Sequence, residues 1–236
     1  MANCEAGSIM SQTIPIFPID IVLFPNQKVP LKIFEPRYRQ MLDDCMSGSR
    51  TFGINVIDGQ NTDGGWASPV KTGTLVYIVK CEDLDLTGSN YYIEILGKKR
   101  FVIEKLISPV IDKPADYFPP DMPSMKQMLR KSSGEPLYFQ ANVNYLDEIQ
   151  DEVNLKDWKF LLGKLELRII DIASKMGIEF ENFTDFIISS GLKLDSANVQ
   201  DLYTLASMCS LPLEAQQIIL EANSSNQIVE ILQKEI

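Results

Sequence analysis

Two groups of neighbouring carboxylates are the residues of this sequence whose types and spacing best suit them to chemistry. Asp43 and Asp44 are adjacent, and Glu82, Asp83 and Asp85 follow farther along the chain. Closely spaced carboxylates can transfer protons or bind a hard cation. They are also ordinary components of a solvated surface, which is the simpler interpretation. An enzyme with an unrecognised acidic site is therefore kept only as an alternative.

The residue types that the sequence lacks narrow the chemistry further. It contains no histidine, which excludes Ser-His and Cys-His catalysis and histidine-ligated metals. Cys4, Cys45, Cys81 and Cys209 form no C-x-x-C pair, and we expect free thiols. No G-x-x-x-x-G-K-S/T phosphate loop is present. No catalytic, cofactor-binding or metal-ligating residue is therefore predicted, and no cofactor is expected.

Net charge and hydropathy limit the partners that the protein can bind and the cellular compartment in which it is expected. The net charge of −10 disfavours binding to a phosphate backbone, and "GKKRF" at Gly97–Phe101 is the one basic cluster that could support it. An RNA-binding protein is thus a second alternative. No apolar run approaches the roughly 18 residues of a membrane span, and the N-terminus does not resemble a secretory signal. We expect a cytoplasmic protein that does not associate with membranes.

The stretch "PLKIFEPRYRQML", at Pro30–Leu42, predicts a sharp change from strand to helix. Pro36 forces Glu35 into an extended conformation and itself suits the first position of a helix. The Glu35 carboxylate would then lie near the positive end of the helix dipole. Arg37 and Tyr38 are candidate contacts for a partner. The alternative is that Tyr38 packs in the core and Arg37 pairs with a nearby acid.

The elements that must position these residues fall into two regions. Eleven of the 13 prolines lie in residues 1–123, and the polar, proline-rich stretch Asp112–Ser124 is the expected joint. The predicted domains are a β-rich domain at residues 10–120 and a helical domain at residues 121–236.

The β-rich domain is predicted to contain short strands and one helix. Apolar alternation predicts strands at Lys28–Phe34 and Thr51–Ile57, and a continuous apolar run at Gly73–Lys80 predicts a strand buried on both faces. Asp58–Gly65 is expected to be a polar loop. Tyr91–Leu106 is expected to be a hairpin that turns at Gly97–Lys99. The expected helix carries its apolar face on Tyr38, Met41, Leu42 and Cys45.

The helical domain is predicted from three features. Seven apolar residues follow a 3-4 spacing: Leu155, Trp158, Leu162, Leu165, Ile169, Ile172 and Met176. We expect them to pack inside a helical bundle, and a coiled coil is the alternative; Asn154 and Gly177 are the expected ends of this helix. A second helix is predicted over Val199–Cys209. Pro212 and a Ser224-x-x-Gln227 capping box mark the starts of two more.

The motifs of the first half, in their order, resemble a known family. "IPIFPIDIVLFPNQKVPLKIFEPRYRQML", then "FGINVI", "GTLVYIVK" and "GKKRF", resemble the N-terminal substrate-recognition domain of the Lon proteases, especially proteins that carry only that domain. "LPLEAQQIILEANSSNQIVEIL" is similar to the helical segment that follows it. Asn26 stands where the family usually has glycine after Phe-Pro, and asparagine can also adopt a left-handed turn.

The resemblance implies an α+β fold, in which a PUA-like β-barrel or sheet domain precedes an all-α helical bundle. It implies a non-catalytic module that binds unfolded or exposed apolar polypeptide, or an unidentified protein partner. After Ile236 there is no room for the ATPase and Ser-Lys peptidase domains of a complete Lon protease. Neither ATPase nor peptidase activity is therefore expected.

A candidate binding surface lies just past the expected joint. Met122, Met125 and Met128 recur every third residue, and flexible methionine side chains suit surfaces that accept varied partners. Tyr117 and Phe118 could add an aromatic anchor. The alternative is that these side chains only seal the two halves against each other.

Overall fold

The chain divides into two compact units. The computed structural model describes residues 12–84, 90–117, 128, 130, 132–177 and 182–236. A β unit holds the chain up to Leu23 and again over Lys28–Leu146, and a helical unit holds Phe24–Gln27 and Asp147–Ile236. The boundary predicted after residue 120 is too early, because the last strand of the β unit, Phe139–Tyr145, lies beyond it. Within the described residues, no helix has the length and apolar character needed to cross a membrane.

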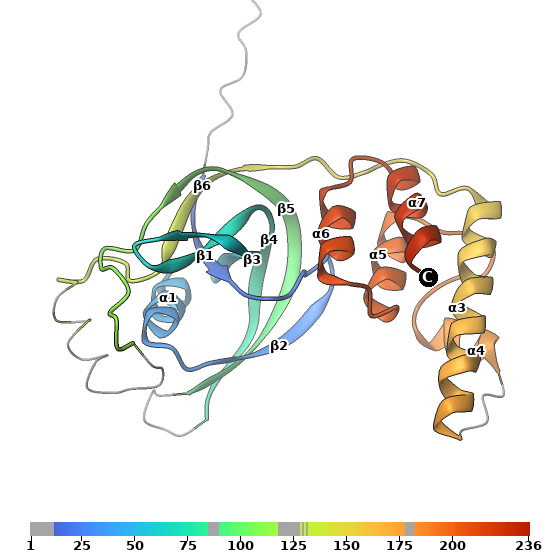
Figure 1. The fold of residues 1–236 in the computed structure, drawn as a ribbon, viewed down its shortest axis with the longest axis horizontal. Helices are drawn as coiled ribbons and strands as arrows, with labels where there is room; N and C mark the ends of the chain where they lie inside the picture. Colours follow the sequence, from blue (N-terminus) through green and yellow to red (C-terminus); the bar gives the residue numbers. More distant parts are fainter. Residues whose placement is uncertain (1–11, 85–89, 118–127, 129, 131, 178–181) are drawn as a thin grey trace, which may run out of the picture. The chain divides into compact units, whose positions relative to one another are not determined.

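Six strands of the β unit form one sheet that curves round on itself (Figure 1). They are β1 (Gln12–Pro18), β2 (Lys28–Ile33), β3 (Thr51–Asp63), β4 (Trp66–Asp83), β5 (Tyr91–Ile107) and β6 (Phe139–Tyr145). Their order is β2-β5-β4-β3-β1-β6, and β6 also pairs with β5, so five of the strands close into a barrel. Among the described strands, β1 and β3 pair in parallel and the other pairs are antiparallel. With the helices described below, this confirms the predicted α+β fold class.

The hairpin predicted at Tyr91–Leu106 is a single long strand. Both halves of β5 pair with β4 on one edge. On the other edge the first half pairs with β2 and the second half with β6, so the two halves do not pair with each other. Gly97 stands opposite Val76 and Arg100 opposite Thr74, with a register shift between them. The glycine and lysines that suggested a turn therefore lie at a β-bulge, which bends a strand without reversing it.

The predicted loop at Asp58–Gly65 is instead the end of a β-hairpin. β3 continues to Asp63, and only Gly64 and Gly65 turn the chain into β4. Both have positive φ, 55° and 77°, as a two-residue hairpin turn requires. The strand expected to be buried on both faces alternates between buried Val76 and Ile78 and more exposed neighbours, because its outer side faces solvent.

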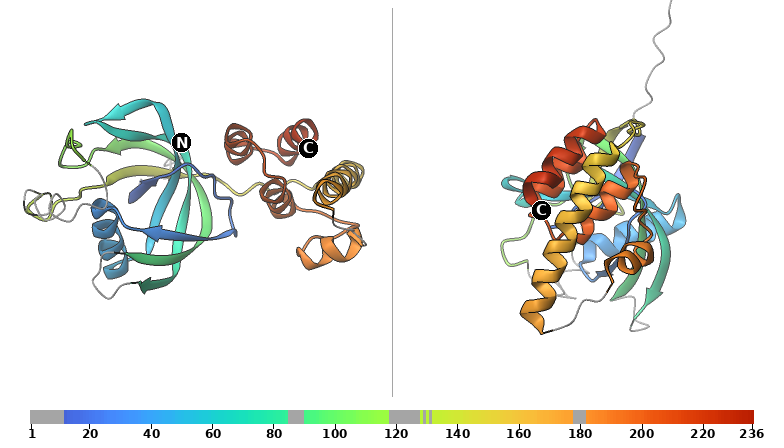
Figure 2. Two further views of the ribbon diagram at one scale, coloured as in Figure 1. Left: turned by 60° about the horizontal axis from the view of Figure 1, so that its bottom comes forward. Right: turned by 90° about the vertical axis from the view of Figure 1, so that its right-hand side faces the viewer.

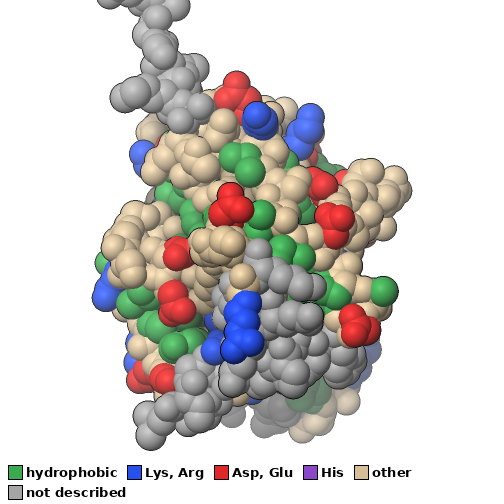
Figure 3. Space-filling model, turned by 90° about the vertical axis from the view of Figure 1, so that its left-hand side faces the viewer, with side chains coloured by type: hydrophobic (Ala, Val, Ile, Leu, Met, Phe, Trp, Pro, Cys, Tyr) green, Lys and Arg blue, Asp and Glu red, His purple; other side chains and the backbone are tan. Residues whose placement is uncertain are grey.

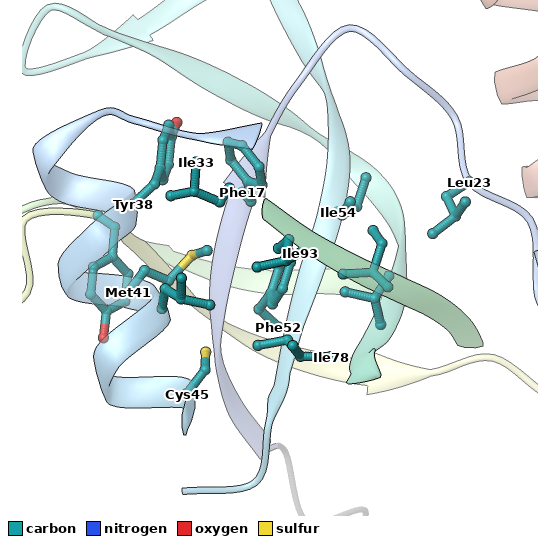
Figure 4. Close-up of a cluster of buried hydrophobic side chains, with 14 residues drawn as sticks. Phe17, Leu23, Ile33, Tyr38, Met41, Cys45, Phe52, Ile54, Ile78 and Ile93 are labelled. Atoms are coloured by element: carbon teal, nitrogen blue, oxygen red, sulfur yellow. The ribbon is translucent and has the colours of Figure 1, made fainter. Parts of the chain in front are cut away.

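The predicted helix of the β unit is α1 (Pro36–Ser47). Its apolar face is the expected one, since Tyr38, Met41, Leu42 and Cys45 are all buried. Figure 4 shows labelled side chains of this helix directed toward Phe17, Phe52 and Ile93 of the strands. The helix and its strand-to-helix corner are thereby fixed against one of the two apolar clusters of the β unit.

The described residues of the helical unit form five helices: α3 (Leu155–Met176), α4 (Phe183–Ser189), α5 (Val199–Met208), α6 (Leu213–Glu221) and α7 (Ser225–Glu235). α7 contacts α3, α5 and α6, and the left panel of Figure 2 shows several of these helices nearly end-on, side by side. The predicted ends of α3 are confirmed, because Asn154 accepts a hydrogen bond from Lys156 N and Gly177 has a φ of 68°.

The apolar seam of α3 is buried along only part of its length. Trp158, Leu162 and Leu165 are buried, as a helical bundle requires. Ile172 and Met176, which continue the same spacing, are exposed. The bundle prediction therefore holds for Trp158–Leu165, whereas Leu155 at the start of the helix and the last two seam residues are exposed.

The tetrapeptide Phe24–Gln27 packs within the helical unit. The Phe24 ring is buried and stacks on Tyr203 of α5, with centroids 5.0 Å apart and planes 9° from parallel. Gln200 donates to the Pro25 carbonyl and accepts from Asn26 Nδ2, at 2.9 Å each. Asn26 has a φ of 62°, which confirms that asparagine makes the left-handed turn here.

Candidate functional site

The Arg37 side chain is clamped between two aromatic rings. Its guanidinium carbon lies 4.3 Å from the Tyr38 ring centroid and 4.1 Å from the Trp66 centroid. Tyr38 comes from the first turn of α1, and Trp66 is the first residue of β4. Trp66 Nε1 donates to the Ile111 carbonyl at 2.9 Å, which fixes the ring. Stacking on aromatic faces is favourable for a guanidinium, so the Tyr38 and Trp66 rings both stabilise its position.

Glu35 ties this clamp to a second aromatic residue. Its Oε2 atom accepts from Arg37 Nε at 3.0 Å and from the Tyr117 hydroxyl at 3.1 Å. The Tyr117 ring meets Trp66 edge-on, with centroids 4.9 Å apart. Glu35 makes no side-chain cap to the helix, so its carboxylate serves the ion pair and the tyrosine. We call Glu35, Arg37, Tyr38, Trp66 and Tyr117 the Arg37 cluster.

The Arg37 cluster has one unfilled hydrogen-bonding position. Arg37 Nη1 is fully buried and has no hydrogen-bond partner among the described residues. The side chain as a whole keeps 12% of its surface exposed. Burial, the largest cause, raises the pKa of the Tyr38 and Tyr117 hydroxyls well above the usual range, and the neighbouring Glu35 carboxylate also raises both. Both tyrosines are therefore neutral at physiological pH, and Tyr117 acts as a donor.

The structure brings together three of the residues singled out from the sequence: Arg37, Tyr38 and Tyr117. Tyr38 is packed and Arg37 pairs with an acid, as the alternative interpretation held. Met128 is buried in the same apolar cluster as Trp66, against which Tyr117 packs. Its side chain therefore fills the core of the β unit and is not available at the surface.

The other predicted site residues are not placed. Phe118, Met122 and Met125 lie outside the described residues, and their role as a binding surface stays a prediction. Trp66 was missed by sequence reasoning, because a tryptophan after two glycines carries no signal of its partners. Its place in the cluster depends on the β3–β4 hairpin, which brings it beside α1.

Asp85 lies outside the described residues, and two of the other acids considered for chemistry have partners that occupy them. Asp44 accepts from the Tyr138 hydroxyl at 2.7 Å, and Glu82 pairs with Lys80 at 2.8 Å. Burial raises the pKa of Asp43, and the adjacent Asp44 adds to this effect. Among the described residues, no group of three or more cysteine, aspartate or glutamate side chains could hold a metal ion.

A second notable surface lies on the helical unit, along α3. Six of the 13 large apolar side chains exposed in the described chain lie on this helix: Leu155, Phe160, Leu167, Ile170, Ile172 and Met176. By contrast, apolar side chains on the face of the molecule shown in Figure 3 are scattered among polar and charged ones. Contiguous exposed apolar surface commonly marks a site of interaction.

Comparisons with known proteins agree with the fold. The family model of the ATP-dependent protease La (LON) substrate-binding domain matches residues 13–235. A Lon protease from Cytophaga hutchinsonii is 24% identical over 203 residues, which is 80% of this chain and 22% of that protein. The chain thus spans about a fifth of the length of this curated relative.

Two solved structures share the fold over almost the whole chain. A Lon N-terminal domain protein from Xanthomonas campestris has a TM-score of 0.62 at 18% identity, covering 94% of this chain and 98% of that one. The N-terminal domain of a Mycobacterium avium complex Lon protease has a TM-score of 0.60 at 13% identity, covering 94% and 97%. The family match covers nearly every residue, and the chain therefore belongs to the Lon substrate-binding domain family.

Proposed function

We propose that this chain is a non-catalytic module that binds unfolded or exposed apolar polypeptide. Membership in a substrate-binding domain family supplies the class of ligand. The observation that carries the proposal is the set of exposed apolar side chains on α3, of which Phe160, Leu167 and Ile170 form a row along one side. These side chains remain uncovered by the helical unit, and the capture of an apolar segment would remove them from water.

The geometry of α3 suits a polypeptide ligand. Phe160, Leu167 and Ile170 recur at spacings of seven and three and so share one side of the helix. Trp158, Leu161 and Leu165 occupy the opposite, buried side. An open hollow of about 630 Å³ lies beside this row, lined by Lys164, Leu167, Arg168, Asp171, Ile172 and Ile236. A volume in this range accepts a few side chains of a bound segment.

Charge adds a preference among such ligands. α3 carries five Lys or Arg and three Asp or Glu, a net charge of +2, within a chain of net charge −10. The helix is therefore basic in composition within an acidic protein. We expect apolar segments flanked by acidic residues to bind better than those flanked by basic residues, with the difference reduced by salt.

The test is capture of a reduced, carboxymethylated test protein that cannot fold. We expect the double change Leu167→Ser and Ile170→Ser to weaken capture about tenfold, because it removes two large apolar contacts worth roughly 1.4 kcal/mol together. Thermal stability should change little, since Leu167 is 70% and Ile170 46% exposed. Fluorescence anisotropy measures the affinity, and calorimetry the stability.

Ile218→Ser on α6 is the matched control, because Ile218 is similarly exposed, at 54%, on another helix of the same unit. It should leave the affinity unchanged. An equal loss of affinity in the control and the α3 variant would remove α3 as the binding surface. No detectable capture by the wild-type chain would overturn the proposed function itself.

A further inference from the structure

Arg37 holds a hydrogen-bond donor that the described protein leaves unused. Nε is paired with Glu35 at 3.0 Å, whereas Nη1 is buried and meets no acceptor in the part of the chain that the structure describes. A buried donor that has lost water and gained no acceptor is costly, and such groups in native proteins call for an explanation. The donor is on a charged guanidinium, whose hydrogen bonds are among the stronger ones in proteins.

Among the described residues, no acceptor of the cluster makes a hydrogen bond to this donor. Tyr38 and Trp66 hold the guanidinium plane from two sides, at 4.3 and 4.1 Å. Glu35 Oε2 already accepts two hydrogen bonds. Trp66 Nε1 is itself a donor and is committed to Ile111. The guanidinium is therefore held in place while this donor remains open to a further acceptor.

The charges of the cluster select the kind of acceptor. Glu35 already balances Arg37 in a partly buried pair, with 21% and 12% of the side chains exposed. A second carboxylate would leave the site with excess negative charge in a setting of reduced solvation, which is unfavourable. A neutral carbonyl oxygen of a peptide bond or of an Asn or Gln amide completes the hydrogen bonding without adding charge.

We propose that Arg37 Nη1 is a donor site for an amide carbonyl oxygen of a bound polypeptide, so that the β unit reads the peptide backbone. This inference rests on the proposed function in one respect, namely that the ligand is a polypeptide. Because Nη1 is fully buried, an acceptor reaches it only when a side chain of the cluster moves, and we assign this movement to Tyr117. Its hydroxyl is held by the one oxygen of Glu35 that Arg37 also uses, and the residue is only partly buried.

The direct test follows the arginine N–H signals of the whole chain by NMR, with ¹⁵N-labelled arginine. The probe is a short apolar peptide that is acetylated at its N-terminus and amidated at its C-terminus. We expect the Arg37 side-chain signals to shift and to exchange more slowly with solvent as the peptide is added. A peptide of the same sequence with a free terminal carboxylate should bind no better. Tighter binding of that peptide, with the larger Arg37 shift, would assign the site to carboxylates and overturn the proposal.

The matched variants are Arg37→Lys and Arg50→Lys. Lysine keeps the charge beside Glu35 but lacks the second nitrogen, so Arg37→Lys should weaken peptide binding about tenfold. Arg50 is exposed and its change should have no effect. If the wild type binds the peptide while the Arg37 signals stay unchanged, the donor is satisfied by a resident water, and this inference fails while the proposed function stands. No binding of either peptide or of the unfolded test protein would overturn both.

Discussion

At the scale of single residues, the barrel depends on positions where the backbones approach closely. Gly73 of β4 lies against Asn55 of β3, whose side chain is buried and donates from Nδ2 to the Val70 carbonyl at 2.9 Å. A Cβ atom at Gly73 would lie 2.5 Å from the Ile54 carbonyl oxygen and would also collide with the Asn55 amide. Neither obstacle is the free end of a flexible side chain, so a substituted residue cannot be accommodated locally.

We therefore expect Gly73→Ala to lower the free energy of unfolding by about 2–3 kcal/mol, as overpacking of a closed core does. Urea unfolding followed by tryptophan fluorescence measures it, since Trp66 is buried in the β unit. Gly59→Ala is the control, because its Cβ would meet nothing within 4 Å and it should change stability by less than about 0.5 kcal/mol. Equal effects of the two changes would contradict this account of the β3–β4 approach.

Some contacts of the Arg37 cluster could be predicted from the neighbouring residues in the sequence, and others could not. The extended Glu35 and the helix start at Pro36 follow from local sterics, and both are observed. The pairing of Arg37 with an acid two residues away was also open to sequence reasoning. Trp66 and Tyr117 come from distant parts of the chain, and only closure of the barrel brings them to Arg37. No local sequence pattern could have indicated that Trp66 stacks on Arg37.

At the scale of elements, helix ends are set by short-range hydrogen bonds. Asn198 begins α5 with a reciprocal capping box: its side chain accepts from Asp201 N at 3.1 Å, and Asp201 Oδ2 accepts from Asn198 N at 2.8 Å. Two N–H groups at the helix start are thereby satisfied. The helix is only ten residues long, so its caps contribute a large share of its local stability.

Asn198→Ala should cost about 1 kcal/mol, and the loss should appear in α5 first. Hydrogen exchange of the α5 amides is the measurement, because it reports the opening of this helix separately from the β unit. Asn198→Ser retains an acceptor at the same position and should stay close to wild type. Unchanged exchange in the alanine variant would show that packing alone, through buried Leu202 and Leu205, fixes the start of α5.

The elements differ in how well the sequence predicts them, for a physical reason. Helix ends are local, and the predicted signals at Asn154, Gly177 and Ser224 are all found at helix ends. A turn and a bulge use the same residues, so the glycine and lysines at Gly97–Lys99 could not distinguish a hairpin from a bent strand. That distinction depends on β2 and β6, which pair with the two halves of β5.

At the scale of the whole molecule, the two units do not follow the order of the chain. Proline density and charge predicted a β region followed by a helical one, and the structure has one unit of each type. The position of the boundary was missed because β6 returns to the barrel after the proline-rich stretch. The assignment of Phe24–Gln27 to the helical unit was not predictable either, since it depends on contacts with α5 more than 170 residues later.

Leu23 and Phe24 show how abruptly the chain changes units. Leu23 is buried in an apolar cluster of the β unit, and its carbonyl accepts from the Thr74 hydroxyl at 2.5 Å. Phe24, the next residue, is 1% exposed and stacks on Tyr203. The helical unit therefore obtains part of its own core from the N-terminal region of the sequence. A fragment that begins at Asp147 would lack this ring and leave Tyr203 uncovered.

Phe24→Ala should accordingly destabilise the helical unit by about 3–4 kcal/mol, because it empties a buried aromatic site and removes a stacked ring pair. Hydrogen exchange should accelerate in α5, while β3 and β4 keep their protection.

Gln200→Ala is the control: it removes two hydrogen bonds to the same tetrapeptide but leaves the ring, and should cost only about 1 kcal/mol. If Phe24→Ala instead loosened the strands and spared α5, the tetrapeptide would belong energetically to the β unit. If a chain beginning at Asp147 were as stable as the helical unit of the intact protein, Phe24 would contribute nothing to that core.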